Sequence, residues 1–484
     1  MTATTLGASE PNAQPQPTPA GATSEPNLSL ARNLKISLFH LGSGMADVMA
    51  TGVWNRVMIT DLGFSATPIG LLVSLRYFLS PLGMWAGRIS DERPILGFHR
   101  LFWIWLGRGL MAASIAALGI ITGQLAAGAP ADAPRWIGIM LALLLFSFGN
   151  AISGSTFLAL IYDRAAPSQR GRAVGVVWTF LLLGYTVGGI VFGIMLPAHG
   201  SDGTLTFTPE TLVNLFVGAA AILGGLWFIS VLGEERRSSG MRSRQSERND
   251  EGSRSIRADL KLAFSNHQTR YFFWYLGLSM LFAFSQDLIL EPFAGDVFGM
   301  SASVTTRFAA YWGMTAIIGT VVFLMLARRY KRLTNTVMSY AGVIALMVAF
   351  GMFAFGALAN VRQMVTPGLL ALGIGLGIWN VGTLGLMMDL SPSGRAGAFL
   401  GFWTLVVTVA RGVGVSGGGI ARDLSLQITG TPNVAYGLVF VGGMVGLGVA
   451  LWALSQVDVR KFRSEFQPQA TATSAEAVLA ASMD

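Results

Sequence analysis

Apolar residues run along this chain in long stretches that short polar connections separate. A helix that crosses a lipid bilayer needs about 20 mainly apolar residues. Twelve stretches meet that requirement, and we expect spanning helices at residues 34–59, 67–89, 99–126, 135–161, 171–197, 209–233, 269–294, 303–328, 334–359, 365–390, 396–422 and 433–457. The pattern therefore predicts an all-α membrane protein with twelve transmembrane helices.

One polar segment divides the predicted helices into two sets of six. Residues 234–268 are rich in charge, serine and glycine, which is typical of a flexible cytoplasmic linker. The chain thus reads as a first six-helix bundle at 34–233 and a second at 269–460. Residues 1–33 and 461–484 are predicted to be disordered tails, because small and polar residues dominate them.

Positive charge alternates from one connection to the next. The connections after the second, fourth, sixth, eighth and tenth helices are basic, whereas the others hold at most one arginine. Cytoplasmic loops carry an excess of lysine and arginine. Both termini are therefore predicted to be cytoplasmic, and the net charge of +8 reflects loop composition. We expect no nucleic-acid partner.

Composition supports a membrane protein and excludes several kinds of chemical site. The 484 residues are 52% hydrophobic and 12% charged, whereas a soluble domain carries about 25% charge. The chain has no cysteine, which excludes disulfides and thiolate metal sites. No phosphate loop, catalytic triad or metal-ligand cluster stands out, so we expect neither a free metal nor an enzymatic activity.

The two halves carry related segments. DRAAPSQRGRA at 163–173 recurs as DLSPSGRA at 389–396, and each copy is followed by Trp-Thr, at 178–179 and 403–404. GFSA at 63–66 likewise matches GMSA at 299–302. Such offsets indicate a duplicated unit. Halves related by an axis along the membrane normal place a binding cavity between them.

The sequence GMWAGRISDER at 83–93 resembles the signature between helices two and three of the major facilitator superfamily. The resemblance implies two pseudo-symmetric six-helix bundles and a cytoplasmic gate formed by Gly83, Gly87, Arg88, Asp91 and Arg93. The segment departs from the signature at Glu92 and Pro94, where a basic residue and a glycine are usual. The second half has no acid in ARRY at 327–330, so the gate is expected to be one-sided.

Three longer segments resemble the PucC/LhaA branch of that superfamily: ADVMATGVWNRVMITDLG at 46–63, SLRYFLSPLGMWAGRISDERP at 74–94 and SQDLILEPFAGDVFGMS at 285–301. The resemblance implies a role in assembling bacterial light-harvesting complexes in the inner or photosynthetic membrane. It also implies handling of bacteriochlorophyll, and as partners membrane lipid, antenna polypeptides and reaction-centre or pigment-synthesis proteins. A bacteriochlorophyll synthase would need paired aspartate-rich motifs at helix ends, which the sequence lacks.

Several polar residues fall inside the predicted helices. A charge at membrane depth costs about 3 to more than 10 kcal/mol, so such residues usually face the protein interior. Asp47 and Arg76 lie at similar depth. They could form an ion pair with each other or bind a ligand directly, and the sequence favours neither alternative. Asp287 and Glu291 lie one turn apart and could relay protons or bind a ligand. The full set predicted to line the cavity is Asp47, Arg76, Asn150, Gln286, Asp287, Glu291, Asn380 and Arg411.

His40 is the histidine placed well within an apolar helix. A neutral imidazole can bind the magnesium of a chlorin, so His40 is a candidate axial ligand, although a packing role is the simpler interpretation. A second function also fits the sequence. The chain could be a proton-coupled transporter of an amphipathic solute, with Asp47, Asp287 or Glu291 as the proton site.

Overall fold

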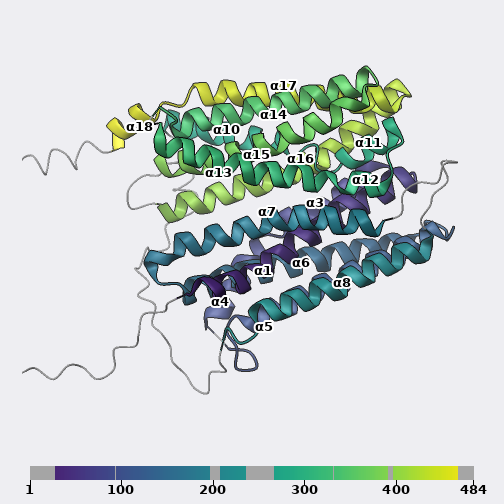
Figure 1. The fold of residues 1–484 in the computed structure, drawn as a ribbon, viewed down its shortest axis with the longest axis horizontal. Coiled ribbons are helices and arrows are strands. Elements are labelled where there is room, and N and C mark those ends of the chain that lie inside the picture. Colours follow the sequence, from purple (N-terminus) through teal and green to yellow (C-terminus); the bar gives the residue numbers. More distant parts are fainter. Residues whose placement is uncertain are drawn as a thin grey trace, which may run out of the picture.

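The computed structural model describes residues 28–92, 94–196, 208–235, 266–330, 332–390 and 396–466. Most of both predicted tails, linker residues 236–265 and Arg93 of the predicted gate lie outside these ranges. Within them the chain is helical, apart from one isolated β-bridge, and the long helices run side by side (Figure 1).

In the first half, one helical stretch covers residues 30–61. It consists of α1 Leu30–Asp47, a π-helical segment Val48–Val53, α2 Trp54–Arg56 and a second π-helical segment Val57–Asp61. The other helices are α3 Ala66–Phe78, α4 Pro81–Glu92, α5 Leu101–Ala126, α6 Ala133–Arg164, α7 Arg170–Met195 and α8 Pro209–Val231.

The second half begins with α10 His267–Ala283 and α11 Leu290–Phe298. It continues with α12 Ala302–Thr306, α13 Phe308–Arg329, α14 Asn335–Leu358, α15 Val365–Asp389, α16 Ala396–Thr429, α17 Pro432–Ser455 and α18 Val459–Phe466. In the described residues, ten helical segments are long and apolar enough to cross a membrane. The chain is thus a multi-pass helical membrane protein. The stretches at 30–61 and 267–298 occupy the remaining two predicted positions, and the total of twelve spans stays a prediction.

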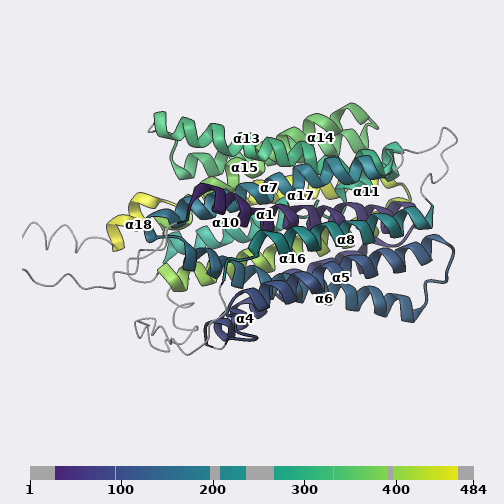
Figure 2. The same cartoon turned by 60° about the horizontal axis from the view of Figure 1, so that its bottom comes forward.

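Helix packing repeats between the halves. In the first half α5 packs on α6 and α8, and α1 packs on α7 and α8; in the second, α14 packs on α15 and α17, and α10 packs on α16 and α17. The halves meet where α3 contacts α16 and where α7 contacts α13. Figures 1 and 2 show α7 between the rest of the first half and α13. This is the arrangement of the major facilitator type.

Glycines set the closest helix contacts at equivalent places. A Cβ on Gly188 of α7 would lie 3.0 Å from the Cα of Met45, and one on Gly414 of α16 would lie 2.3 Å from the carbonyl oxygen of Leu281. Gly188 and Gly414 are 226 positions apart, which is also the offset between the related segments that begin at 163 and 389. Small residues allow close backbone approach in membranes. The duplication seen in sequence therefore has a counterpart in packing.

Polar contacts join the halves at the end of the bundle opposite α18 (Figure 1). Asp423 of α16 accepts hydrogen bonds from the backbone amide of Thr67, at 2.7 Å, and from its hydroxyl. Ser303 Oγ donates to the carbonyl of Gly193. These bonds cap the start of α3 and tie α7 to α12, so the halves are held together at this end.

Two predicted helices are interrupted, and in each case a proline marks the break. Helix 67–89 is divided before Pro81, where α4 begins. The predicted continuous helix at 269–294 is wrong: α10 ends at Ala283, a turn follows, and α11 begins at Leu290. Pro292 lies in the first turn of α11 and does not end a helix, because a proline needs no amide partner there.

Candidate functional site

An ion pair lies in the first half between Asp47 of α1 and Arg76 of α3. Arg76 Nη1 donates to Asp47 Oδ1 at 2.8 Å, and the Tyr185 hydroxyl of α7 donates to Asp47 Oδ2 at 2.8 Å. Arg76 Nη2 donates to the Tyr77 hydroxyl. The Arg76 side chain is 9% exposed and that of Asp47 26%. These four residues, Asp47, Arg76, Tyr77 and Tyr185, form the first-half cluster.

A second ion pair lies in the other half. Arg411 Nη2 of α16 donates to Asp287 Oδ2 at 3.1 Å, and Gln286 Nε2 donates to Asp287 Oδ1 at 2.8 Å. The Arg411 guanidinium also lies over the Phe284 ring, 4.0 Å from its centroid. Gln286 and Asp287 stand in the turn between α10 and α11. Phe284, Gln286, Asp287 and Arg411 form the second-half cluster.

The two clusters meet at one aromatic ring. Tyr77 lies 4.7 Å from the Arg76 guanidinium carbon and 5.2 Å from that of Arg411, measured to the ring centroid. A cation over a tyrosine ring is attracted by its quadrupole. Tyr185 and Arg411 are themselves 226 positions apart, so they occupy equivalent places in the two halves. We call the combined set the central network.

Glycines next to the network bring its members within reach. Cβ atoms on Gly44 and Gly184 would each lie 2.3 Å from a carbonyl oxygen of the opposite helix, so α1 and α7 touch one turn before Asp47 and beside Tyr185. In the second half a Cβ on Gly418 would lie 1.9 Å from the carbonyl oxygen of Ser285, close to Asp287. The helix backbones therefore approach most closely beside the network residues.

The network balances its charges. It contains two arginines and two aspartates, and each aspartate accepts from an arginine and from one neutral donor. A buried charge is tolerated when it is paired and hydrogen-bonded. Asp47 is also the last residue before the π-helical segment Val48–Val53, and such segments occur frequently at functional sites. These features make the central network the candidate functional site.

Glu291 does not join this network. It lies in the first turn of α11, is 7% exposed and forms no ion pair with any residue in the described part of the chain. The prediction that Asp287 and Glu291 share one helical face is wrong, because the break after Ala283 places Asp287 in a turn. The two carboxyl groups therefore occupy different environments.

Asn150 and Asn380 lie on α6 and α15, both with exposed side chains. They are 230 positions apart, about one helical turn more than the offset of 226 between the related segments, and neither contributes to the central network. Their position on a cavity wall stays a prediction.

His40 packs among aromatic rings. Its ring stacks on Phe157 at 5.1 Å and meets Trp178 edge-on at 5.9 Å, while Nδ1 is buried without a hydrogen-bond partner in the described residues. A histidine that binds a metal through one nitrogen usually donates the other N–H to a fixed partner. This geometry favours the packing role, and the role as a magnesium ligand stays a prediction.

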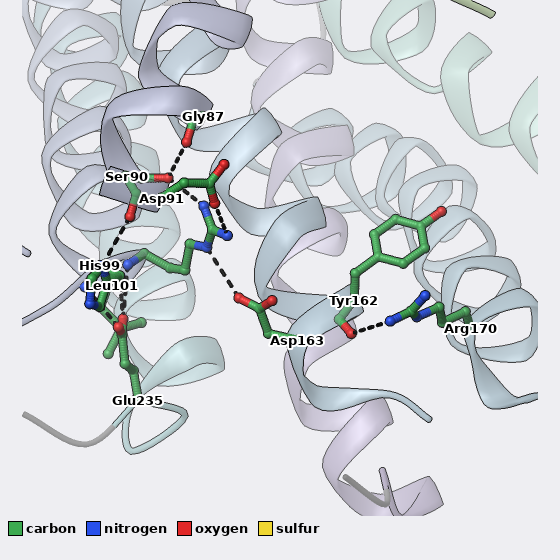
Figure 3. A network of polar contacts seen from close by, with 10 residues as sticks. Gly87, Ser90, Asp91, His99, Leu101, Tyr162, Asp163, Arg170 and Glu235 are labelled. Atoms are coloured by element: carbon green, nitrogen blue, oxygen red, sulfur yellow. Dashed lines mark hydrogen bonds and ion pairs between the residues drawn. The ribbon is translucent and has the colours of Figure 1, made fainter. Parts of the chain in front are cut away.

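Among the predicted gate residues, Asp91 belongs to a network of polar contacts within the first half (Figure 3). Asp91 pairs with Arg100, and Arg100 also reaches Asp163 at 3.2 Å. Glu235 accepts the backbone amides of His99 and Leu101 at the start of α5. The basic partner of Asp91 is thus Arg100, and Figure 3 shows the network drawn from α4, the start of α5, the end of α6 and the segment after α8.

The other gate residues have more local roles. Gly83 permits α4 to touch α6, since a Cβ there would lie 2.7 Å from the carbonyl oxygen of Ala151, and Ser155 donates to the carbonyl of Gly83. Gly87 has open space around it, and Arg88 is exposed. Only Gly83 thus behaves as a packing glycine of the signature.

Tyr77 and Tyr185 are the members of the candidate site that stand in apolar helices and that sequence reasoning missed. Each stands in an apolar helix, and each hydroxyl bonds to a charged residue. A buried tyrosine usually has a partner for its hydroxyl. Two features of the sequence could have indicated them. Tyr77 directly follows Arg76, and Tyr185 occupies the position in the first half that is equivalent to Arg411 in the second half.

A family model described as PUCC protein matches residues 53–462. This chain belongs to that family. Protein PucC of Rhodovulum sulfidophilum is 32% identical over 413 residues, which cover 84% of this chain and 87% of that protein. A protein of Rhodobacter capsulatus named bacteriochlorophyll synthase 44.5 kDa chain is 30% identical over 419 residues, 84% of this chain and 90% of that protein.

The fold is similar to that of solved transporters. A bacterial homologue of the human lysosomal transporter Spinster, in an inward-facing and unoccupied conformation, superposes with a TM-score of 0.67. The match covers 91% of this chain and 98% of that one at 17% identity. The match region of the PUCC family includes every residue of the central network except Asp47.

Proposed function

We propose that this protein is an assembly factor for bacterial light-harvesting complexes, which binds bacteriochlorophyll or delivers it to antenna polypeptides in the membrane. The observation that carries the proposal is family membership over residues 53–462. The names of relatives support a role in photosynthesis, since one is called PucC and another a bacteriochlorophyll synthase chain.

The central network supplies the chemistry for a pigment site. Bacteriochlorophyll is an amphipathic molecule whose ketone and ester oxygens accept hydrogen bonds. The Nε groups of Arg76 and Arg411 are buried without a hydrogen-bond partner in the described residues and could donate to such an oxygen, and Tyr77 and Phe284 provide aromatic surface beside them. Because the network is already charge-balanced, it suits a ligand without net charge better than an anion.

Antenna polypeptides are the proposed protein partners. They would contact the outer helix faces, where lipid is otherwise the neighbour, and receive pigment from the site between the halves. Reaction-centre or pigment-synthesis proteins are further candidates for the same faces. Trp85, Trp274 and Trp452 are at least half-exposed on those helices and offer sites for fluorescence measurements of lateral contact.

Synthase chemistry is not part of the proposal, despite the name of one relative. A prenyl transfer from a diphosphate needs clustered carboxylates to hold magnesium ions. In the described helices, Asp47, Asp287, Asp296 and Asp423 are each bound to an arginine instead. Arginine pairing supports a structural and ligand-binding role for these carboxylates.

The proposal is tested by isolating the full chain from its native membrane in mild detergent and recording its absorption. We expect far-red absorption from bound bacteriochlorophyll, and antenna polypeptides in the same fraction. The Arg76→Met and Arg411→Met variants should carry less pigment per chain, whereas Arg135→Met, at an exposed ion pair, should match wild type. A colourless preparation without antenna polypeptides would contradict the proposal.

A proton-coupled transporter of an amphipathic solute is the second candidate. Two observations favour it: the likeness to transporter folds, and Glu291, which is buried and forms no ion pair within the described part of the chain. Reconstituted protein would then take up solute in a manner that collapses with the proton gradient. Uptake of this kind, together with normal antenna complexes in a strain without the protein, would favour the transporter.

A further inference from the structure

The geometry points to Glu291 as a proton-binding site that is occupied in the conformation seen here. This inference does not depend on a role in antenna assembly. Glu291 differs from the aspartates of the helical bundle that pair with arginine. Asp47 pairs with Arg76, Asp61 with Arg56, Asp287 with Arg411, and both Asp296 and Asp423 with Arg422. Glu291 forms no ion pair in the described residues and is 7% exposed.

The neighbours of Glu291 on its own helix are buried and apolar. Leu290, Phe293 and Ala294 beside it on α11 are at most 2% exposed. Across the contact lies Gly52 in the π-helical segment of the first half, where an added Cβ would be 3.8 Å from Glu291 Oε1. An isolated carboxylate in such a place loses its hydration without gaining a counter-ion, and a buried group of this kind takes up a proton instead.

The charged and titratable groups around Glu291 all have other partners. On the first helix Arg56 donates to Asp61 at 2.8 Å and to the carbonyl of Met300 at 3.0 Å. On α17 the Tyr436 hydroxyl donates to Asp296 at 2.6 Å. Asp287, in the turn before Glu291, is bound to Arg411. Arg56 Nε is buried without a hydrogen-bond partner in the described residues, but the Arg56 guanidinium already forms an ion pair with Asp61 and none with Glu291.

Because Glu291 lies where the two halves meet, loss of its proton would affect a contact between them. Glu291 lies directly after the break between α10 and α11, and α11 packs on α2 and on the π-helical segment Val57–Asp61 of the first half. Arg56 lies against Gly295, one turn beyond Glu291. Once Glu291 loses its proton, its carboxylate competes with Asp61 for Arg56. Arg56 also donates to the Met300 carbonyl and so joins the two halves. The protonation state of Glu291 is therefore linked to this contact between the halves.

The test uses the infrared carbonyl stretch of a protonated carboxylic acid, recorded on the purified full chain at neutral pH. We expect a band that shifts in deuterium oxide and disappears in Glu291→Gln. Glu210→Gln is the matched control: Glu210 is also the second residue of its helix and also adjoins a proline, but it is exposed, so its substitution should leave the band unchanged.

Glu291→Asp keeps the carboxyl group and serves if the glutamine variant does not fold. Its band should remain but move in frequency, because the shorter side chain changes the environment of the group. A wild-type protein without the band, a band that persists in Glu291→Gln, or an identical band in Glu291→Asp would overturn the assignment. None of these readouts involves pigment or antenna polypeptides.

Discussion

Replacing Asp47 by asparagine tests whether the central network is held together by its charges. The substitution leaves the Arg76 guanidinium without its counter-ion while conserving side-chain size. Removing one partner of a fully buried pair costs about 3–5 kcal/mol, whereas an exposed pair contributes about 0.2–1 kcal/mol. Arg76 is 9% exposed and Asp47 is 26% exposed, so the pair lies nearer the buried limit. We expect Asp47→Asn to lower the free energy of unfolding by about 2–3 kcal/mol.

The coupling between the partners is the sharper quantity. Arg76→Met and the double variant complete a double-mutant cycle, measured by unfolding the helical protein in mixed micelles with a denaturing detergent. The double variant should be destabilised by less than the sum of the single ones, with a coupling of at least about 1 kcal/mol. Because the Tyr185 hydroxyl also loses Asp47 as a charged acceptor, a Tyr185→Phe background should reduce the cost of Asp47→Asn.

The control is the pair between Asp132 and Arg135 at the start of α6, with side chains 41% and 26% exposed. The same cycle there should give a coupling below about 0.5 kcal/mol. If the cycle at Asp47 and Arg76 is additive within about 0.5 kcal/mol, the two residues do not act as a pair and the reasoning about the network fails.

Three further outcomes follow from the geometry. Asp423→Ala removes the cap that one half provides to α3 of the other, and it should cost about 1–2 kcal/mol in the same unfolding assay. Gly44→Ala places a Cβ 2.3 Å from the Leu181 carbonyl oxygen and should destabilise strongly, whereas Gly154→Ala, with open space around it, should be neutral or slightly stabilising; equal effects would contradict the close-packing account. His40→Ala should leave the pigment content of the isolated protein unchanged, and loss of pigment would restore the magnesium-ligand hypothesis.

Much of the fold could be predicted because the bilayer imposes a simple rule on sequence. Long apolar stretches predict the helices, and a short repeated segment predicts the duplication. The interruption between α10 and α11 was missed because apolar residues flank the three polar residues at the break, Ser285, Gln286 and Asp287, although Pro292 carried a signal. A proline in an apolar run fits the first turn of a new helix as well as the end of an old one.

The candidate site was predicted in part. The ion pair between Asp47 and Arg76 could be predicted, because helix rise is regular and both residues lie at similar depth in two helices that a short turn joins. The bond between Arg411 and Asp287 depends on the rotation of α16 against α10, which their close glycine contacts set in three dimensions. The separation of Glu291 from Asp287 depends on the helix break, so helical spacing could not reveal it.

The most direct test of the central claim is the absorption spectrum of photosynthetic membranes from a strain that lacks this protein. The account predicts a marked loss of the near-infrared bands of at least one antenna complex, restored by the wild-type chain and restored less by Arg76→Met. Antenna bands of normal height in the strain without the protein would contradict the assignment as an assembly factor.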